Sequence, residues 1–458
     1  MPKKYREEKD TMGTMRVPDN AYYGPQTARA AENFPISGLT LPKDFIRALA
    51  LLKKCAARVN RELGLMEEEI SKTIIKAAQE VMDGKHDDQF IVDVFQTGSG
   101  TSTNMNMNEV IASRGNEILT GNKGGKFPIH PNDHVNLGQS SNDVIPTTIH
   151  LSTLVSMERR LMPALNSLSG ELAKKAAEFA AVKKIGRTHL QDAVPMRLGD
   201  EFSGYARQIR QGIRRLQSVQ DGLRELAIGG TAVGSGLNAH PEFARRVIEL
   251  VSEHTGITFK EAENHFEAQA AQDTAVETSG ALKTVAVSMV KIANDIRWLS
   301  SGPRCGIGEI TLPSLQPGSS IMPGKVNPVI PESVIQVAAQ VMGNDTTIML
   351  GGQSGNFELN VMLPVIAHNL LQSVHLLSSA AKVFAEKCIS GITANRQICE
   401  ANVEKSLAMV TGLVPHIGYD RAAAIAKTAY ETGKTVREVA MEEKVLPEET
   451  LNRVLEES

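Results

Sequence analysis

The most regular feature of this sequence is a series of apolar residues spaced three and four positions apart over long segments. The clearest run follows Leu198 and comprises Phe202, Tyr205, Ile209, Ile213, Leu216, Val219, Leu223 and Leu226. This spacing places the side chains on one face of a single helix. Similar patterns predict long helices over residues 161–179, 266–299, 331–350 and 359–388. Helices of this length gain most of their stability from packing, so the pattern predicts a helix bundle.

Changes in this pattern divide the chain into three regions. The first part has shorter helical segments and turns rich in Gly and Asn, such as residues 121–125, and the part after Ala422 has short amphipathic segments. We predict an N-terminal domain over residues 1–139, a central long-helix bundle over residues 140–396 and a small C-terminal helical domain over residues 397–458. The predicted fold class is mainly all-α.

Composition supports this fold class and excludes several functions. Aromatic residues make up only 4% of the 458 residues, which favours helix packing over a β-sandwich. The net charge of -3 provides no overall basic field for nucleic acid. No apolar run of about 18 residues could span a membrane, and the first 13 residues are too polar for a signal peptide. The four cysteines are scattered, as is typical of reduced thiols. We therefore expect a cytoplasmic protein without nucleic acid or membrane partners.

Five short polar clusters lie between the predicted helices. They cover residues 97–108, 130–133, 139–143, 186–192 and 318–328, and they are rich in hydroxyl and amide side chains. One such cluster is usually a turn or a helix cap, but five in one helical protein suggest a binding site. Their donors suit a small anionic ligand, with Lys325 and Arg187 supplying positive charge.

Residues 318–328 form the most informative of these clusters. Two glycines and two prolines in the segment GSSIMPGKVNP exclude a helix and predict an ordered but movable loop. The loop presents Ser319, Ser320, Lys325 and Asn327 together. These residues could form a lid whose cation and amide hold a carboxylate while a hydroxyl transfers a proton.

Several common catalytic motifs are absent from the sequence. It contains neither a GxxxxGK[ST] nor a strand-linked GxGxxG motif, which argues against a phosphate-cradling or dinucleotide-binding loop. The eleven histidines form no HExxH pattern, and no GxSxG motif is present. We therefore predict no metal and no cofactor.

The segment GSSIMPGKVNP resembles the signature loop of the fumarase/aspartase superfamily, whose members release fumarate by eliminating a group β to a carboxylate. The other polar clusters resemble superfamily motifs in the same order, as do residues 301–309 and 355–360, so the resemblance spans nearly the whole chain. Within the superfamily, the chain resembles the class II fumarases. It has His189 where aspartate ammonia-lyases have Gln, and Asn356, Phe357 and Glu358 where they have Gln-Leu-Gln.

The resemblance implies a fumarase/aspartase-like fold and a homotetramer with active sites shared between three subunits. It implies reversible, metal-independent hydration of fumarate to L-malate, a reaction of the tricarboxylic acid cycle, by removal of the C3 proton and formation of an aci-carboxylate intermediate. The carboxylate groups of the substrate would be held by Ser99, Gly100, Thr101, Ser140, Ser141, Asn142, Thr188, Ser320, Lys325, Val326 and Asn327.

The resemblance also implies catalytic roles for three residues. Ser319 would accept the C3 proton, provided that backbone N–H groups and Lys325 stabilise its alkoxide. His189 would act on the water side, and Glu332 could orient it. A second, non-catalytic carboxylate site would comprise His130, Pro131, Asn132 and Asp133.

Two alternatives remain open at this point. The first is an aspartate ammonia-lyase of the same fold. The second is a non-catalytic relative with a structural or binding role, which would be expected to lack Ser319, Lys325 or His189.

Overall fold

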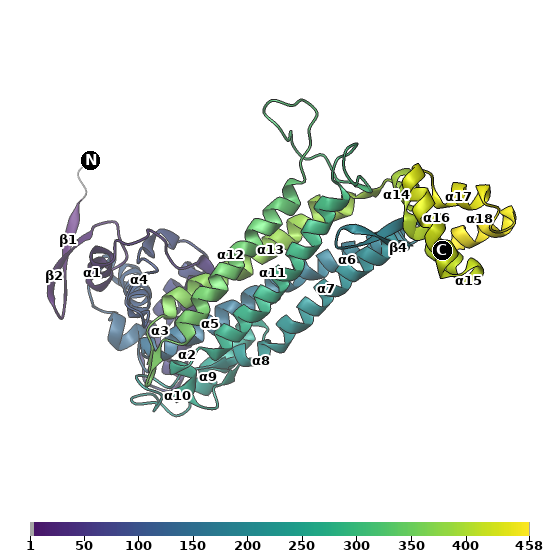
Figure 1. Cartoon of the computed structure of the whole chain (residues 1–458). Helices are drawn as coiled ribbons and strands as arrows, with labels where there is room; N and C mark the ends of the chain where they lie inside the picture. Colours follow the sequence, from purple (N-terminus) through teal and green to yellow (C-terminus); the bar gives the residue numbers. More distant parts are fainter. Residues whose placement is uncertain (1–3, 458) are drawn as a thin grey trace. The chain divides into compact units, whose positions relative to one another are not determined.

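The computed structural model describes residues 4–457, and long helices dominate them (Figure 1). The helices are α1 (Pro25–Asn33), α2 (Lys43–Glu62), α3 (Glu68–Met82), α4 (Thr101–Thr120), α5 (Ser141–Ser156), α6 (Met162–Glu178), α7 (Leu198–Ser218), α8 (Gln220–Leu223), α9 (Phe243–Thr255), α10 (His265–Ala270), α11 (Asp273–Leu299), α12 (Val329–Gly352), α13 (Leu363–Lys387), α14 (Arg396–Lys405), α15 (Val414–Ile417), α16 (Tyr419–Thr432), α17 (Val436–Glu442) and α18 (Glu448–Glu457). The mainly all-α fold class is confirmed.

Ten short strands pair into small two-stranded sheets. They are β1 (Tyr5–Asp10), β2 (Gly13–Pro18), β3 (Lys183–Thr188), β4 (Gln191–Arg197), β5 (Glu225–Leu226), β6 (Lys260–Glu261), β7 (Ile310–Thr311), β8 (Gly355–Asn356), β9 (Leu359–Asn360) and β10 (Thr393–Ala394). The sheets join β1 to β2, β3 to β4, β5 to β6, β7 to β10, and β8 to β9. Only the β5–β6 pair is parallel.

The predicted long helices are present, with corrections at their ends. The prediction of one helix from Phe202 to Leu226 is wrong beyond Ser218, where α7 ends. The Ser218 hydroxyl donates a hydrogen bond back to the carbonyl of Arg215, which competes with the helical pattern. Leu226 lies instead in a short strand, where it pairs with Glu261 and is buried. The predicted helix over 266–299 is divided between α10 and α11, and the helix predicted from 359 starts at Leu363.

By its internal contacts the chain divides into two compact units, each built from discontinuous segments. The first unit contains the segment up to Pro163 together with Gly212–Ala286 and Val337–Ser378. The second contains Ala164–Gln211, Val287–Gln336 and the segment from Ser379. In the first unit α2 packs against α3, α5 and α9 and buries Phe45, Leu49 and Leu52.

The C-terminal helices form their own hydrophobic core within the second unit. Leu413, Ile425, Val439 and Leu451 are all buried there, at most 1% exposed. Ile185 of β3 completes this core, so the β3–β4 hairpin is anchored on the C-terminal helices. The C-terminal helices depend on this core, because helices this short are not stable alone.

Candidate active site

The first group of predicted substrate-binding residues lies at two helix N-termini in the first unit. Gly100 caps α4, and Ser140 caps α5 in a capping box in which its hydroxyl accepts from the backbone N–H of Asn142. Ser99 and Thr101 lie within hydrogen-bond distance of each other through their hydroxyls, at 2.9 Å. A helix N-terminus attracts anions because its first N–H groups are unpaired and its dipole is positive there.

Two glycines fix the approach to α4. A Cβ at Gly98 would lie 1.7 Å from the carbonyl oxygen of Val361, so only glycine fits at this point. The carbonyl of Gly98 accepts a hydrogen bond from the N–H of Leu363, which ties the segment to the start of α13. Gly100 has φ +73, a conformation that favours glycine. The backbone therefore requires the Gly-Ser-Gly pattern, and it holds Ser99 at the start of the helix.

The two N-termini open into one cavity of about 640 Å³. Thr101, Ser140, Ser141 and Asn142 line it together with other residues. The Asn142 side chain donates to the carbonyl of Ala232 at 2.8 Å, which sets its orientation. The structure thus brings four of the predicted carboxylate-binding residues to one concave surface.

A buried lysine that sequence analysis did not predict lies beneath this cavity. Lys53 of α2 is 0% exposed, and its ammonium donates to the side-chain oxygens of Asn136 at 2.9 Å and Gln139 at 3.0 Å. Asn104 of α4 also donates to Asn136, at 3.1 Å, and to the Ser141 hydroxyl at 3.1 Å. A chain of hydrogen bonds therefore links the lysine to a predicted substrate-binding residue.

Asp143 provides the negative charge in this buried network. Burial raises the pKa of Asp143 to about 6, although the backbone N–H groups of Ser140, Thr231 and Gly229 donate to its carboxylate. Burial also lowers the pKa of Lys53 to about 7, against the attraction of Asp143. Sequence analysis placed Asp143 in the polar cluster 139–143 without a role of its own. It missed Lys53 because this residue precedes another lysine and resembles part of a solvated helix face. The sequence signal for this buried polar network was the i,i+4 spacing of Asn104 and Asn108.

His189 lies at the tip of the β3–β4 hairpin in the second unit. Thr188 pairs with Gln191, so His189 and Leu190 form a two-residue turn with φ of 57° and 59°. Left-handed conformations in residues other than glycine cost about 1–2 kcal/mol each and concentrate at functional sites. His189 is exposed and makes no hydrogen bond within the described part of the chain, which leaves both ring nitrogens available. The sequence did not predict this hairpin.

Arg187 supports the base of this hairpin and is not a free cation. Its guanidinium donates to both carboxylate oxygens of Glu309, at 3.0 and 2.7 Å. Lys184 lies 3.3 Å from the same carboxylate and 2.6 Å from Glu201, and Asn402 donates to Glu309 at 3.2 Å. Glu309 is 0% exposed. The expectation that Arg187 supplies charge to a ligand is therefore wrong, because its charge is used in a buried ion pair.

The charges around Glu309 keep it ionised despite its burial. Burial alone would raise the pKa of Glu309, but the hydrogen bonds from Arg187 and the charge of Lys184 outweigh it and hold the pKa below its ordinary value. The hairpin that carries His189 is thereby attached to the segment preceding β7 through charge-assisted hydrogen bonds, which are stronger than neutral ones.

The loop between α11 and α12 carries Ser319 and is neither helix nor strand over residues 318–328, as predicted (Figure 1). The Ser319 hydroxyl oxygen accepts from the backbone N–H groups of Ile321 at 3.2 Å and Met322 at 3.0 Å. The loop is closed at its neck by the N–H of Gly318, which donates to the carbonyl of Lys325 at 2.7 Å, and by the Asn327 amide, which donates to Gly318. Two N–H groups directed at one hydroxyl oxygen would stabilise negative charge on it.

A cavity of about 880 Å³ adjoins this loop in the second unit. Lys325, Val326, Asn327 and Glu332 line it, and so does Leu190, the neighbour of His189. The loop, the first turn of α12 and the hairpin tip therefore share one cavity. Ser320 is exposed in the same loop. No hydrogen bond joins Glu332 to His189 in the described residues, so the orienting role of Glu332 stays a prediction.

The predicted second carboxylate site forms a turn at the start of a π-helical segment, Pro131–Val135. The His130 Nδ1 accepts from the backbone N–H groups of Asn132 and Asp133, each at 3.1 Å. Burial lowers the pKa of His130, with the charge of Asp133 opposing it. Because Nδ1 accepts these two bonds, the ring hydrogen of His130 lies on Nε2, which can act as a donor. Asn132 and Asp133 also line the cavity of about 640 Å³.

The predicted site residues are thus divided between the two units. The first unit holds residues 99–101, 130–133 and 140–142, and the second holds residues 188, 189, 319, 320, 325–327 and 332. Neither unit by itself contains all of the residues predicted for catalysis and carboxylate binding. Within residues 4–457, no cluster of three or more His, Cys, Asp or Glu side chains could hold a metal ion. None of the helices there is long and apolar enough to cross a membrane.

Long helices, polar helix N-termini, a loop bearing a serine and a histidine on a hairpin are the features expected of a fumarase/aspartase-type lyase, and the chain belongs to this class. Residues 13–343 match the family described as Lyase, and residues 409–457 match the family described as Fumarase C C-terminus. The chain is 55% identical to the class II fumarate hydratase of Nitrosomonas europaea over 437 residues, 95% of each chain.

Two further relatives extend this similarity. The class II fumarate hydratase of Halobacterium salinarum is 55% identical over 456 residues, which cover 100% of this chain and 97% of the relative. The crystal structure of class II fumarase from Schistosoma mansoni has a TM-score of 0.95 at 42% identity and covers 99% of this chain and 98% of that one. The chain belongs to the class II fumarate hydratase family.

Proposed function

We propose that this chain catalyses the reversible hydration of fumarate to L-malate. The observation that carries the proposal is the Ser319 hydroxyl, whose oxygen accepts two backbone N–H groups in a loop that also presents Lys325 and Asn327. Near-full-length identity of 55% to class II fumarate hydratases supports the same reaction. Serine is otherwise far too weak a base, so this environment is what the chemistry requires.

In the dehydration direction, the Ser319 alkoxide removes the C3 proton of L-malate. The electron pair left on C3 spreads into the adjacent carboxylate, which becomes a dianion, the aci-carboxylate. Lys325 and Asn327 then stabilise the growing negative charge, and such preorganised donors are usually the largest contribution to catalysis.

His189 completes the reaction on the C2 side. The imidazolium donates a proton to the departing hydroxide, so that water leaves and the electron pair of the dianion forms the C2–C3 double bond of fumarate. In the hydration direction neutral His189 activates the water instead. Histidine suits both roles because its ordinary pKa of about 6.5 allows either protonation state near neutral pH. Glu332 serves as the carboxylate that orients it.

The other substrate carboxylate is held at the N-termini of α4 and α5. Ser99, Thr101, Ser140, Ser141 and Asn142 supply neutral donors, which orient a dianion without burying further charge. Gly100 and the backbone N–H groups of the first helical turns add to this set. Thr188, Ser320 and Val326 contact the substrate from the hairpin and the loop, and the His130 Nε2–H would hold a second, non-catalytic carboxylate.

The active form is proposed to be a homotetramer whose sites combine residues of different subunits. This assembly would unite the groups that each unit holds separately. The exposed residues of α12 after its first turn support an interface, because none of them is charged: Ser333, Gln336, Ala339, Gln340, Gly343, Thr346, Met349 and Leu350. Interface cores are depleted of charge in the same way.

Three further points belong to this proposal. The chain acts in the tricarboxylic acid cycle, in the cytoplasm, and needs no metal or other cofactor for the reaction. The division into domains over residues 1–139, 140–396 and 397–458 is retained.

The function is tested by following fumarate absorbance with L-malate or L-aspartate as substrate, each with and without a metal chelator. Fumarate from L-malate only, unaffected by the chelator, is expected. Fumarate from L-aspartate only would instead show an ammonia-lyase, and no product from either substrate would favour a non-catalytic relative.

Two variants test the catalytic residues. Ser319→Ala and His189→Asn should each lower kcat by about 10²–10⁴-fold. Ser314→Ala, in the exposed stretch just before the loop, and the exposed His416→Asn are matched controls and should leave kcat unchanged. Near-normal turnover in a folded Ser319→Ala or His189→Asn protein would remove that residue from its role.

Subunit sharing is tested by mixing two inactive variants, Ser319→Ala and Asn142→Ala, and reassembling them. If one site takes these two residues from different subunits, random tetramers regain about a quarter of full activity, since each site draws each residue independently. If both residues come from one subunit, no activity returns.

A further inference from the structure

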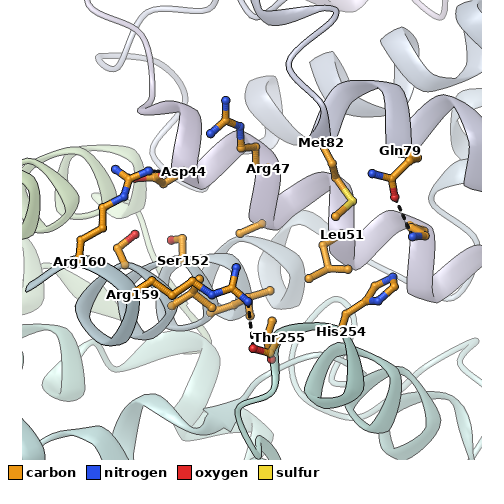
Figure 2. Close-up of a pocket in the computed structure, with 15 residues that line it drawn as sticks. Asp44, Arg47, Leu51, Gln79, Met82, Ser152, Arg159, Arg160, His254 and Thr255 are labelled. Atoms are coloured by element: carbon orange, nitrogen blue, oxygen red, sulfur yellow. Dashed lines mark hydrogen bonds and ion pairs between the residues drawn. The ribbon is translucent and has the colours of Figure 1, made fainter. Parts of the chain in front are cut away.

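A second, separate cavity of about 340 Å³ lies in the first unit, among α2, α3, the end of α5 and α9 (Figure 2). Its volume is at the lower end of the range for small-molecule sites. None of the residues assigned to the substrate or to the second carboxylate site lines it. The cavity therefore needs an explanation of its own.

Positive charge dominates the lining of this cavity. The lining contains four cationic side chains, those of Arg47, Lys54, Arg159 and Arg160, and one carboxylate, that of Asp44. Asp44 is already engaged, because Arg160 donates to both of its oxygens at 2.9 and 3.0 Å. The other three cations have no acidic partner among the lining residues.

Arg47 is the residue whose environment most clearly lacks a partner. It makes no hydrogen bond or ion pair within the described residues, and its Nε is buried from solvent. A buried polar group without a partner is destabilising, and a guanidinium with free N–H groups matches the two oxygens of a carboxylate or phosphate. The nearby carboxylate of Asp87 pairs with Lys43 at 2.7 Å, and no ion pair joins it to Arg47 in the described residues. An anion in the cavity would supply the missing partner of Arg47.

Arg159 and His254 approach the cavity from other elements. Arg159 lies in the π-helical segment Met157–Leu161 that follows α5, and such segments are frequent at functional sites. One of its nitrogens donates to the carbonyl of Thr255 at 2.9 Å, and its other N–H groups have no partner within residues 4–457. Figure 2 shows Arg159 extending toward Thr255 and His254.

Neutral groups complete the lining. Lys54 donates to the Gln79 side chain at 2.8 Å, and Ser156 lies nearby on α5. Leu51 and Met82 form apolar parts of the wall. An occupant would thus carry two or more anionic groups and one less polar face.

We propose that this cavity binds a small polyanion, a molecule with two or more phosphate or carboxylate groups, which pairs with Arg47, Lys54 and Arg159. The site is independent of the proposed hydratase activity. It is joined to the substrate site through α5, which begins at the candidate substrate residue Ser141 and ends at Ser156 against the cavity.

Isothermal titration calorimetry on the intact protein tests this proposal with two probes, tripolyphosphate and citrate. Both titrations are performed in buffer without any dicarboxylate, and the variants below separate binding in this cavity from binding at the substrate sites. Saturable binding of at least one probe is expected, and the probe that binds more tightly identifies phosphate or carboxylate as the preferred group.

Variants then locate the binding. Arg47→Met and Arg159→Gln should each raise Kd by about ten-fold or more, the loss of one charge-assisted pair. Arg159→Lys should retain part of the affinity. Arg245→Gln, which removes the same charge from an exposed position on α9, is the matched control and should change Kd by less than about two-fold.

Three results would overturn the proposal. They are the absence of binding by both probes, an unchanged Kd in Arg47→Met and Arg159→Gln, and an equal loss in Arg245→Gln. Fumarate hydratase assays and circular dichroism confirm that each variant is folded, so that loss of binding is not confused with unfolding. Failure of the proposed hydratase function would leave these titrations unaffected, since the variants lie outside that site.

Discussion

Removal of the Glu309 carboxylate should be among the most destabilising single changes in the second unit. Glu309 is 0% exposed and is bonded to Arg187, Lys184 and Asn402. Glu309→Ala would leave the Arg187 guanidinium, only 17% exposed, without its bidentate acceptor. Lys184, 1% exposed, would keep only Glu201.

The size of the effect follows from this geometry. Removing one partner of a buried ion pair typically costs about 3–5 kcal/mol, because the remaining charge stays buried without compensation. Glu309→Gln keeps the shape and one acceptor oxygen, so it should cost about 2–3 kcal/mol. Glu442→Ala breaks an exposed ion pair with Lys434 and is the matched control, for which no measurable change is expected.

Urea unfolding at one fixed protein concentration measures these differences, so that any association between copies affects all variants alike. The activity of Glu309→Gln should also fall, because Arg187 positions the hairpin that carries His189, and a displacement of about 1 Å can cost 10²-fold in rate. A loss below about 1 kcal/mol for Glu309→Ala would refute the conclusion that this pair anchors the hairpin.

Three further substitutions test other parts of the structure. Lys53→Met should remove the part of the pH dependence of folding stability that Lys53 causes. Burial lowers the pKa of Lys53 to about 7, against the charge of Asp143. Above that pH the unfolded chain therefore binds more protons than the folded one. The free energy of unfolding of the wild type should rise between pH 7 and pH 9 as a result. The stability of Lys53→Met relative to the wild type should therefore fall by about 2 kcal/mol over this range. If urea titrations show the same stability difference between the two proteins at every pH, a buried lysine with this pKa is contradicted. Gly98→Ala places a Cβ 1.7 Å from the Val361 carbonyl oxygen. It should lower the free energy of unfolding by at least about 3 kcal/mol and raise KM for L-malate. A normal melting temperature would disprove the close approach. Lys444→Gly, at φ 51 after the end of α17, should stabilise the protein by about 1 kcal/mol because glycine tolerates this conformation, and a lower urea midpoint would count against it.

Apolar spacing determined most of the helical architecture. The steps of three and four between Leu161 and Phe179, and over residues 331–350, correspond to α6 and α12 in the structure. The glycines and prolines of residues 318–328 correctly predicted a loop. These features depend on neighbours within one or two helical turns, which is the range over which sequence patterns carry information.

The β3–β4 hairpin was not predictable in this way. The strands are short, and the turn places His189 and Leu190 at positive φ, where Gly, Asn or Asp would be expected. The hairpin forms because Ile185 packs into the core of the C-terminal helices and Arg187 pairs with Glu309. Tertiary contacts thus outweigh a local preference against the turn.

The polar clusters and their candidate chemistry could be recognised from the sequence alone, since each motif is short and continuous, such as residues 318–328 around Ser319. Only the tertiary structure decided which charged side chains remain available to a ligand. Arg187 is neutralised by Glu309, 122 residues away, and Lys53 is buried against Asn136, 83 residues away. Such pairings depend on how distant helices and strands pack, and the free energy of a charge depends on the solvent and partners that this packing leaves to it.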